Sequence, residues 1–319
     1  MQSISLSTIV LTYNQQDTVE ESVASVLSQD VQPMEIVITD DCSPDGTFDA
    51  IQRAVAGYDG PHTVILNRNP TNLGLAGNLE KAHALSTGDI IIAAAGDDIF
   101  YPNRSQRILE RFLAEDPLLV CSHAKVIDPE GTPLPGDFLT ALFYRSPWTI
   151  EQAARSKSLY IGATGAWHRT LYTDYGPIDP ESYEDLVLGF RAALMGRVAV
   201  IEEELVQYRL GSGITSSDGY DANMAAFENR RRKGFVAQRA VMRQRIKDAK
   251  RFGLDETSAV LRVLNREMAK AAIGVSYYDT AAGSFRSQFL RHPLLGLYTL
   301  RSERRRKRKL LRQLRAKSG

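Results

Sequence analysis

The chain has 319 residues, of which 43% are hydrophobic and 24% charged. This composition is typical of a globular protein with one or two domains and excludes a disordered or fibrous chain. The formal net charge is +1, but residues 301–319 hold ten Lys and Arg side chains and one acid, whereas residues 1–300 hold 29 basic and 37 acidic side chains. The acidic body has no basic stripe for nucleic acid, and the basic tail predicts an anionic partner.

Cysteine usage and hydropathy indicate the compartment. Cys42 and Cys121 are the only cysteines, and they lack the spacing of a disulfide framework or a zinc ribbon, which favours a reducing cytoplasm. The N-terminus has no basic segment followed by an apolar core and a cleavage site, and no apolar run approaches the roughly 20 residues that a spanning helix requires. We therefore expect a protein that is neither exported nor integral to a membrane.

Strand and helix patterns alternate over the first 116 residues. Four times, an apolar or β-branched run leads through a polar loop into a segment whose apolar residues recur at helical spacing. The expected strands are ISLSTIVL near residues 5–10, MEIVITDD at 34–41, HTVILNR at 62–68 and DIIIAAAGDD at 89–98, and the expected helices cover 19–29, 48–55, 78–86 and 103–116. This alternation predicts an α/β fold with a mostly parallel sheet flanked by helices and a ligand site at the carboxyl ends of the strands.

Beyond Asp128 the alternation gives way to Pro- and Gly-rich segments, which include LYIGATGAWHRTLY and SYEDLVLGFRAALMGRVAVIEEELVQYRLG. After Ser216 the sequence changes again. Residues 223–253 and 256–278 carry apolar residues at helical spacing together with many Arg. We therefore expect an α/β domain over residues 1–215 and a helical C-terminal extension over residues 216–319 that ends in the basic tail.

The tripeptide GDD at residues 96–98 is the strongest candidate for chemistry. A carboxylate fixed at the end of a buried strand can bind a hard divalent cation that also bridges diphosphate oxygens, and Gly96 allows close approach of the backbone. Two adjacent acids more often cap a helix or face water, and for an isolated pair that interpretation would prevail. The residues at the other strand ends reverse this preference.

Polar residues at those strand ends suit a nucleotide sugar. A tyrosine ring after the first strand can stack on a nucleobase, a carboxylate after the second can accept a hydrogen bond from a ring N–H, and Asn and Gly at the third helix allow phosphate or ribose to approach its N-terminus. Solvated turns and helix caps are the alternative for each. The candidates are Thr12, Tyr13 and Asn14, then Asp40 and Asp41, then Asn72 and Gly74.

In this order and spacing, seven segments between residues 5 and 209 resemble family 2 glycosyltransferases of the GT-A fold. The segments are STIVLTYNQ, EIVITDDCSPDGT, NLGLAGN, TGDIIIAAAGDD, GATGAWHR, YEDLVLGFRAALMG and VQYR. The resemblance implies a GT-A (nucleotide-diphospho-sugar transferase) fold, with residues 1–215 as the catalytic domain. It also implies that Tyr13 stacks on uracil, that Asp41 contacts the base, that Asp97 lies near the ribose as the first acid of a DxD-like motif, and that Asp98 ligates Mn²⁺ or Mg²⁺.

On the acceptor side, the resemblance makes GATGAWHR, with Gly165 and Trp167, a wall beneath the donor sugar, although Trp167 could equally fill the core. It maps the catalytic base to Asp185, with Glu184 beside it. This assignment agrees with the chemistry, because inversion needs one carboxylate to take the acceptor proton as the hydroxyl attacks. Both acids also fall in the first turn of an expected helix, whose positive end would keep Asp185 ionised.

One departure concerns the phosphate contact. Many relatives have a histidine shortly after the YR dipeptide, whereas this chain continues as Leu210-Gly211-Ser212-Gly213. The pyrophosphate contact would then fall to Arg209, to Ser212 or to backbone amides. His168 is the nearest histidine, and an isolated histidine is more often structural than a ligand.

The tail SERRRKRKLLRQLRAKSG follows the apolar segment FLRHPLLGLYTL, a combination expected of a peripheral membrane contact. A solvated tail is the alternative, and nucleic acid is disfavoured because no aromatic platform accompanies the charge.

We therefore predict a metal-dependent inverting glycosyltransferase that uses a nucleotide-diphosphate sugar, a UDP-sugar by resemblance. Its acceptor would be a hydroxyl of a glycan or lipid-linked molecule at the inner membrane face, in surface polysaccharide biosynthesis, and the chain is compatible with an oligomer. The first alternative is a catalytically silent nucleotide-sugar-binding subunit of a glycan assembly complex. The second, a nucleotidyltransferase, would need a Gly-rich loop with a basic residue near the first strand, which TYNQQ lacks.

Overall fold

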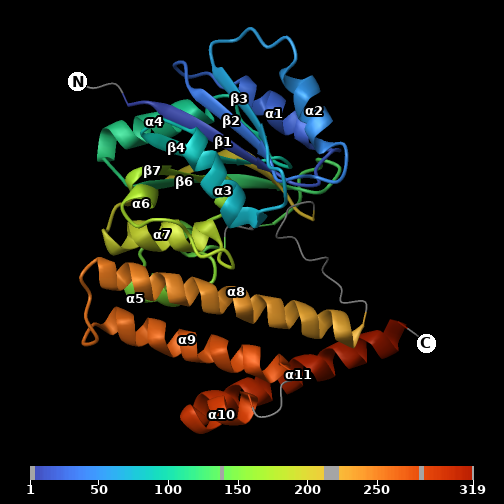
Figure 1. The fold of residues 1–319 in the computed structure, drawn as a ribbon, viewed down its shortest axis with the longest axis vertical. Helices are drawn as coiled ribbons and strands as arrows, with labels where there is room; N and C mark the ends of the chain where they lie inside the picture. The colour runs from blue at the N-terminus through green and yellow to red at the C-terminus, as the bar shows by residue number, and fades with distance from the viewer. Residues whose placement is uncertain (1–3, 137–139, 212–222, 280–283, 318–319) are drawn as a thin grey trace. The chain divides into compact units, whose positions relative to one another are not determined.

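The computed structural model describes residues 4–136, 140–211, 223–279 and 284–317. The chain divides into two compact units, Met1–Ser217 and Asp218–Gly319. The first unit is an α/β sheet domain and the second is helical (Figure 1).

The described residues of the first unit form an eight-stranded sheet in the order β3-β2-β1-β4-β7-β6-β8-β5. The pairs β3–β2, β2–β1, β1–β4 and β6–β8 are parallel, and the pairs that β7 and β5 make are antiparallel. The strands are β1 (Leu6–Thr12), β2 (Glu35–Asp40), β3 (Thr63–Arg68), β4 (Ile90–Ala95), β5 (Ile99–Phe100), β6 (Leu119–Ile127), β7 (Gly165–His168) and β8 (Val198–Arg209). The expected α/β fold with a mostly parallel sheet is confirmed.

Helices cover both faces of this sheet. Because successive side chains of a strand point to opposite faces, alternate residues such as Val10, Ile38 and Ala94 join a hydrophobic cluster with α1, α2 and α4, all of them buried. On the other face, α3 packs against β1 and β2, and α7 against β6 and β8. The helices are α1 (Val19–Leu27), α2 (Thr47–Val55), α3 (Gly74–Leu85), α4 (Arg104–Glu115), η1 (Leu142–Tyr144), α5 (Ile150–Arg155), η2 (Gly162–Thr164), α6 (Thr170–Thr173) and α7 (Glu184–Leu194).

Three strands were not assigned from the sequence: β6 lies just before Asp128, and β7 and β8 lie in the loosely patterned segments after it. β7 has only four residues, and β8 carries the acids Glu202–Glu204, so neither shows a clear period of two. β8 lies between β6 and β5. It pairs with β6 across a register shift near His123, and with β5 on its other side. This second pairing brings the end of β8 to the residues that follow β4.

The second unit consists of α8 (Met224–Arg251), α9 (Ala259–Tyr278), α10 (Ser284–Arg291) and α11 (Pro293–Lys317) in its described residues. Asn223 and Ser258 cap α8 and α9 by accepting hydrogen bonds from Ala226 N and Val260 N. Arg231 of α8 forms an ion pair with Glu303 of α11, with 2.8 Å between Nη2 and Oε1. No helix in the described part of the chain has the length and apolar character needed to cross a membrane.

Candidate functional site

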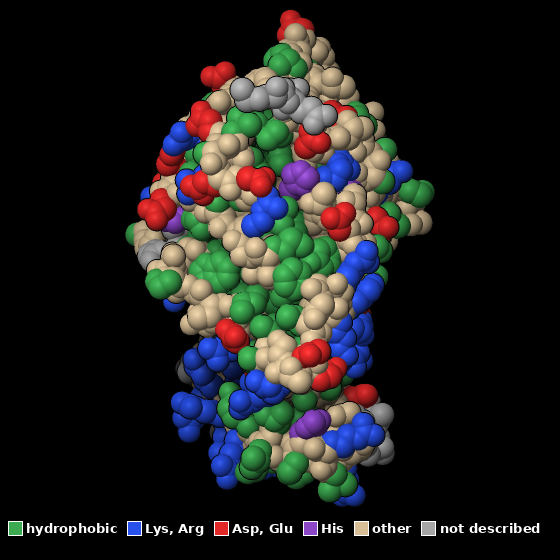
Figure 2. Space-filling view, turned by 90° about the vertical axis from the view of Figure 1, so that its left-hand side faces the viewer, with side chains coloured by type: hydrophobic (Ala, Val, Ile, Leu, Met, Phe, Trp, Pro, Cys, Tyr) green, Lys and Arg blue, Asp and Glu red, His purple; other side chains and the backbone are tan. Residues whose placement is uncertain are grey.

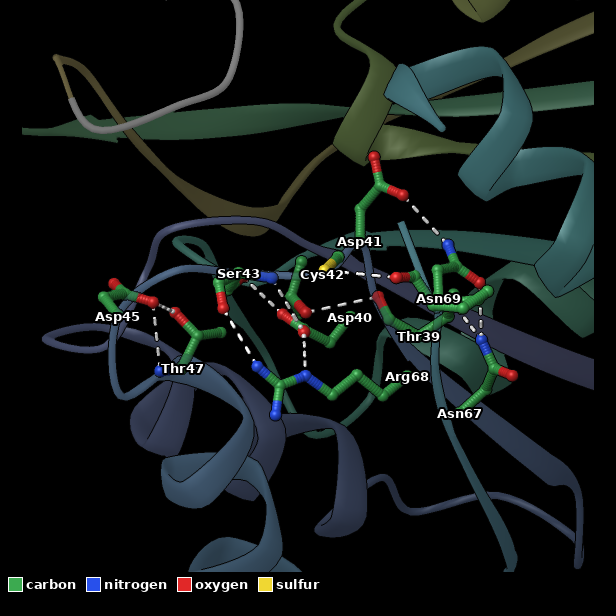
Figure 3. Close-up of polar contacts among 12 residues, drawn as sticks. Thr39, Asp40, Asp41, Cys42, Ser43, Asp45, Thr47, Asn67, Arg68 and Asn69 are labelled. Atoms are coloured by element: carbon green, nitrogen blue, oxygen red, sulfur yellow. Dashed lines mark hydrogen bonds and ion pairs between the residues drawn. The ribbon is translucent and has the colours of Figure 1, made fainter. Parts of the chain in front are cut away.

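The loops that follow β1 and β2 are bonded to each other at the carboxyl edge of the sheet. Figure 3 shows the second of these loops, with the contacts of Asp40 to Arg68 and of Asp41 to Asn69. Ser43 Oγ accepts a hydrogen bond from Asn14 N at 2.9 Å and donates one to the carboxylate of Asp40. The next residue of the first loop, Gln15, donates a hydrogen bond from its N to Thr47 Oγ1 of the second at 2.7 Å. These bonds fix the positions of both loops, so the groups that they present to a ligand are held in place before it binds.

Asp40 lies beneath these loops and is fully buried. Its Oδ2 accepts a hydrogen bond from Ser43 N at 3.0 Å and lies 3.4 Å from Arg68 Nε, while Arg68 Nη2 donates to Ser43 O at 3.0 Å. Asp40 is therefore a structural anchor of the β2–α2 loop. The sequence singled out Asp40 as a base contact and overlooked Arg68, which carries no motif of its own.

Asp41 joins the end of β2 to the start of α3. Its Oδ1 accepts hydrogen bonds from Leu73 N at 2.8 Å and from Asn69 Nδ2 at 3.0 Å, and its Oδ2 accepts one from Gly74 N at 2.9 Å. Asn72 Oδ1 also accepts from Gly74 N, at 3.0 Å. Asp41 and Asn72 thus cap α3, and the predicted contacts of Asp41, Asn72 and Gly74 with a nucleotide stay predictions.

A network of amide and hydroxyl side chains supports Asp41 from below, and it was not predicted from the sequence. Asn69 Nδ2 also donates to Asn78 Oδ1 at 2.9 Å, and Thr39 Oγ1 donates to the same oxygen at 2.5 Å. Asn67 Nδ2 donates to Asn69 Oδ1 at 2.9 Å and to Thr39 Oγ1 at 3.2 Å. Thr39, Asn69 and Asn78 each donate and accept, which rigidifies a buried polar cluster. Asn67 lies in β3 and Asn69 just beyond its end, and this spacing is the only signal that could have indicated the network.

The three residues predicted after β1 differ in accessibility. Thr12 is fully buried, and its Oγ1 donates to Thr39 O at 3.2 Å. Tyr13 is partly buried, and Asn14 is exposed with a positive φ of 56°. Tyr13 and Asn14 are therefore able to meet a ligand directly, whereas the side chain of Thr12 serves the packing between β1 and β2.

The acids after β4 lie on a tightly packed turn. A Cβ on Gly96 would come within 2.5 Å of Gln15 Oε1 and 2.8 Å of Thr12 Cγ2, so only glycine fits. Because β5 pairs with β8, Arg209 N reaches Asp98 and donates to its Oδ1 at 2.8 Å. The other oxygen of Asp98, Oδ2, is buried and has no hydrogen-bond partner among the described residues.

The electrostatics of Asp98 follow from this burial. Removal from water raises the pKa of Asp98 well above its ordinary value, and the neighbouring charge of Asp97 raises it further. Arg104 and Arg209 oppose the rise. Arg104 is itself buried and donates to Ala93 O and Ala163 O, both at 2.8 Å, and burial lowers its pKa to about 9. A carboxylate in this position gains strongly from a cation.

The residues fit a divalent cation, because an unpaired buried carboxylate oxygen is the ligand that Mg²⁺ and Mn²⁺ prefer. Within the described ranges, no group of three or more His, Cys, Asp or Glu side chains could hold a metal ion. Sites of this kind commonly use one or two carboxylates and complete the coordination with substrate phosphates and water. Asp98, with Asp97 beside it, matches that arrangement.

Arg209 is buried at the end of β8 and bonded on all sides to protein. Its Nε donates to Asp97 O at 2.9 Å, its Nη1 to Pro129 O at 2.8 Å, and its Nη2 forms an ion pair with Glu21 Oε2 at 2.9 Å. The guanidinium thus holds the Asp97–Asp98 turn, and its predicted pyrophosphate contact stays a prediction. Ser212, the alternative contact, lies outside the described residues.

Glu184 and Asp185 open α7. Asp185 Oδ1 accepts a hydrogen bond from Leu186 N at 2.7 Å, at the positive end of the helix. Glu184 Oε2 is buried without a partner in the described part of the chain. Burial, and then the charge of Asp185, raise the pKa of Glu184 to about 8. Both effects favour the protonated form of Glu184, in which the carboxyl group can donate a hydrogen bond.

The predicted acceptor wall is built from β7 and the turn before it. A Cβ on Gly165 would come within 2.5 Å of the Tyr160 ring, so this glycine lets the ring pack against the strand. Trp167 is 1% exposed and lies between β4 and β6. His168 Nδ1 lies 2.8 Å from Thr170 Oγ1, a local contact that agrees with a structural histidine.

Both acid pairs line one cavity of about 410 Å³. Aromatic rings and a lysine complete its lining, and Gln15 joins it to the loop after β1. The lining residues that matter for chemistry are Gln15, Asp97, Asp98, Lys157, Tyr160, Gly162, Trp167, Tyr183, Glu184, Asp185 and Tyr208. A cavity with a candidate cation site and a separate carboxyl pair is suited to transfer of a group from an anionic donor to a hydroxyl.

The fold and this site define the class of protein as a glycosyltransferase of the GT-A type. The family model described as Glycosyl transferase family 2 matches residues 7–168, which is half of the chain, so the chain belongs to this family. It spans from 36% to 64% of the length of curated relatives that it matches. One of these is the putative teichuronic acid biosynthesis glycosyltransferase TuaG of Bacillus subtilis, with 30% identity over 129 residues, 40% of this chain and 50% of TuaG.

Solved structures share the fold. Residues 1–349 of TarS of S. aureus, in complex with UDP-GlcNAc, give a TM-score of 0.57 and 17% identity over 88% of this chain and 75% of that TarS chain. The mannosyltransferase PcManGT from Pyrobaculum calidifontis, in complex with GDP-Man and Mn²⁺, has a TM-score of 0.56 and 17% identity over 97% of this chain and 86% of PcManGT. Both likenesses concern the fold alone.

Proposed function

We propose that the chain is a metal-dependent inverting glycosyltransferase. It moves a sugar from a nucleotide-diphosphate donor, a UDP-sugar, to a hydroxyl of a glycan or lipid-linked acceptor. The observation that carries the proposal is the single cavity that joins the Asp97–Asp98 turn to the Glu184–Asp185 pair. Residues 1–215 are the catalytic domain, and residues 216–319 are a helical extension.

On the donor side, the rigid loops after β1 and β2 hold the nucleotide. Tyr13, which is partly accessible, stacks on the base. Asp41, which is hydrogen-bonded to the start of α3, contacts the same base. Asp98 holds a Mn²⁺ or Mg²⁺ ion, with Asp97 near the ribose. When bound, the ion neutralises charge on the diphosphate leaving group. Support comes from the unpaired Oδ2 of Asp98 and from the Mn²⁺ and GDP-Man in the complex of PcManGT.

On the acceptor side, Asp185 takes the proton of the attacking hydroxyl. Its place at the N-terminus of α7 favours the charged carboxylate. Glu184 is protonated near neutral pH and donates a hydrogen bond to a sugar oxygen, so one base acts alone. A single base supports inversion, because retention by a double displacement needs a second, nucleophilic carboxylate. Trp167, which lines the cavity, contributes to the wall beneath the sugar, and Gly165 lies beside it on β7.

The setting that we propose is surface polysaccharide biosynthesis at the inner face of the cell membrane. Support comes from the name of TuaG, a relative in teichuronic acid biosynthesis, and from the free thiols of Cys42 and Cys121, which suit a reducing compartment. A lipid-linked acceptor would lie in the membrane, and a peripheral contact through the basic residues 301–317 would bring the enzyme to it.

The test is transfer and hydrolysis with a panel of UDP- and GDP-sugars and Mn²⁺, with and without a chelator. We expect turnover with one donor, which chelation abolishes and which Asp98→Ala lowers at least about 100-fold. Turnover that survives chelation would contradict the metal assignment. Donor binding without any turnover would instead favour the catalytically silent subunit. The nucleotide-sugar panel thus separates the proposal from its alternative.

A further inference from the structure

Helix α11 presents one long exposed stripe. Its buried face contains Thr299, Glu303 and Leu310, with 5%, 2% and 8% of their surface exposed. The exposed face follows the opposite side of the helix, where residues three and four apart lie in one row. The row consists of Leu294, Tyr298, Arg301, Arg305, Arg308 and Arg312, all of them exposed.

The beginning of this stripe is apolar. Leu294 is 82% exposed and Tyr298 65%, and Leu290 at the end of α10 is 81% exposed. Single exposed leucines are ordinary, but a group of them beside a charged surface indicates an interaction site. Leu294 and Tyr298 also line a shallow surface hollow with Arg301 and Arg305. The apolar and basic parts of the stripe are therefore contiguous.

The rest of the stripe is positively charged without compensation. The only acid on α11, Glu303, faces inward and pairs with Arg231, and it also lies 3.4 Å from Arg306. Lys307 pairs with Glu228 at 2.5 Å. Six further cations have no ion pair among the described residues: Arg301, Arg304, Arg305, Arg308, Lys309 and Arg312.

Figure 2 shows Lys and Arg side chains gathered over the second unit, with hydrophobic side chains among them. Arg306 and Lys307 pair with acids of this chain, so the six other cations of α11 are available to a ligand or a partner. An anionic surface that covers them would relieve their mutual repulsion. The arrangement thus calls for a partner that is negatively charged over an extended area.

We propose that the α10–α11 surface, made of Leu290, Leu294, Tyr298 and the six unpaired cations, docks on a bilayer that contains anionic phospholipid. The cations contact headgroup phosphates, and the leucines and the tyrosine enter the boundary between headgroups and acyl chains. The proposal gives the peripheral contact a defined surface. The purpose of this docking, the capture of a lipid-linked acceptor, rests on the proposed function. The binding to the bilayer does not depend on that function.

A bilayer explains both halves of this surface, whereas nucleic acid explains one. Bases stack on aromatic platforms that are interleaved with the charges, but here aliphatic side chains lie together at one end. An interfacial helix combines Lys and Arg on its polar part with Leu and Tyr on its apolar part. The stripe on α11 has this composition, with the two parts arranged along the helix.

The test is cosedimentation of the full chain with vesicles of phosphatidylcholine, alone or mixed with phosphatidylglycerol. We expect binding to the mixed vesicles and little to phosphatidylcholine. Arg301→Glu with Arg305→Glu should weaken binding at least about tenfold, because each cation near an anionic surface contributes about fivefold. Leu290→Ser with Leu294→Ser should weaken it about tenfold at low and at high salt, because salt screens only the charges.

The matched control is Arg232→Glu with Arg266→Glu, two exposed arginines on α8 and α9 that give the same change of net charge. It should bind as well as the unaltered chain to within about twofold. Equal loss in the control, equal binding to both vesicles, or binding to RNA in place of vesicles would overturn the proposal. Transfer to a water-soluble acceptor, measured in parallel, should be unchanged in all these variants, which separates failure of docking from failure of the proposed function.

Discussion

The candidate site has two halves, the loops after β1 and β2 and the cavity lined by the two acid pairs, and their carboxylates differ in hydrogen bonding. In the loops after β1 and β2, the oxygens of Asp40, Asp41 and Asp45 accept hydrogen bonds from backbone amides and hydroxyls. Around the cavity, by contrast, Asp98 Oδ2 and Glu184 Oε2 are buried without partners in the described chain. The carboxylates of the first half, the scaffold half, therefore stabilise the fold of the loops. Those of the second, the cavity half, have buried oxygens that a ligand can satisfy.

This difference has an energetic meaning. A buried polar group with partners contributes to stability, whereas one without partners costs free energy until a ligand satisfies it. The scaffold half should therefore lose stability when it is altered, and the cavity half should lose activity. Enzymes commonly hold such unfavourable groups at their sites, because activity requires them and stability does not.

The largest effect is expected at Asp98. Asp98→Asn keeps an acceptor for Arg209 N but removes the charge of the proposed cation ligand, so transfer should fall at least about 100-fold. The midpoint of thermal unfolding should stay the same or rise, because a buried charge is lost. Enzyme assay and calorimetry together check this. The exposed Asp49→Asn on α2 should change neither property, and a marked loss of stability in Asp98→Asn would erase the contrast between the two halves.

Asp40 tests the scaffold half. Asp40→Ala leaves Ser43 N and Arg68 without their acceptor, so the free energy of unfolding should fall by about 3 kcal/mol. Urea denaturation measures the change, and Asp49→Ala is the matched control with an expected change within about 0.5 kcal/mol. A drop no larger than that of the control would show that Asp40 does not anchor the loop.

Glu184 gives the contrast a pH dependence. Its pKa is raised from 4.5 to about 8, mainly by burial, so between these values the folded protein holds a proton that the unfolded chain has released. Stability should therefore fall as pH rises from about 4.5 to about 8, by at most about 1.4 kcal/mol per pH unit, and then level off. Unfolding curves of the unaltered chain and of Glu184→Gln measure this contribution. Identical pH profiles for the two proteins would contradict a protonated Glu184.

The smallest effect is expected within the amide network. Thr39→Val removes the hydroxyl that donates to Asn78 Oδ1 and accepts from Asn67 Nδ2, so unfolding should become easier by about 1 kcal/mol. Donor affinity should decrease only slightly, because Asp41 keeps its bonds to Leu73 N and Gly74 N. Denaturant titration and donor titration check the two effects. A loss of donor affinity larger than the loss of stability would place Thr39 in the site itself.

Much of the first half could be predicted from the sequence. Its strands are apolar runs that end in Thr12, Asp40 and Ala95, and parallel strands bring their carboxyl ends together, so the candidate residues were expected at one edge of the sheet, where the structure places them. The sequence could not show which partners each acid has. Asp41 caps α3, 32 residues away, through Leu73 N, and such a contact depends on the packing of the helix against β1 and β2.

The prediction of the second half, the cavity with its two acid pairs, depended more on the resemblance to family 2 glycosyltransferases than on hydrophobic periodicity. β7 is too short, and β8 too charged, to show the period of a strand, so the pairing of β8 with β5 was not predicted. That pairing places Arg209 under Asp98 and explains why its guanidinium faces protein acceptors. The buried Arg104 was missed for the same reason, since its partners Ala93 and Ala163 come from distant segments.

The most direct test of the account is Asp185→Asn. The proposed function assigns Asp185 to the acceptor and Asp98 to the donor, so this variant should bind the donor and Mn²⁺ with unchanged affinity in a thermal-shift titration, while sugar transfer falls at least about 100-fold. Asp98→Asn should lose both binding and transfer. Transfer by Asp185→Asn at a rate close to that of the unaltered chain would contradict the division of roles between the two acid pairs.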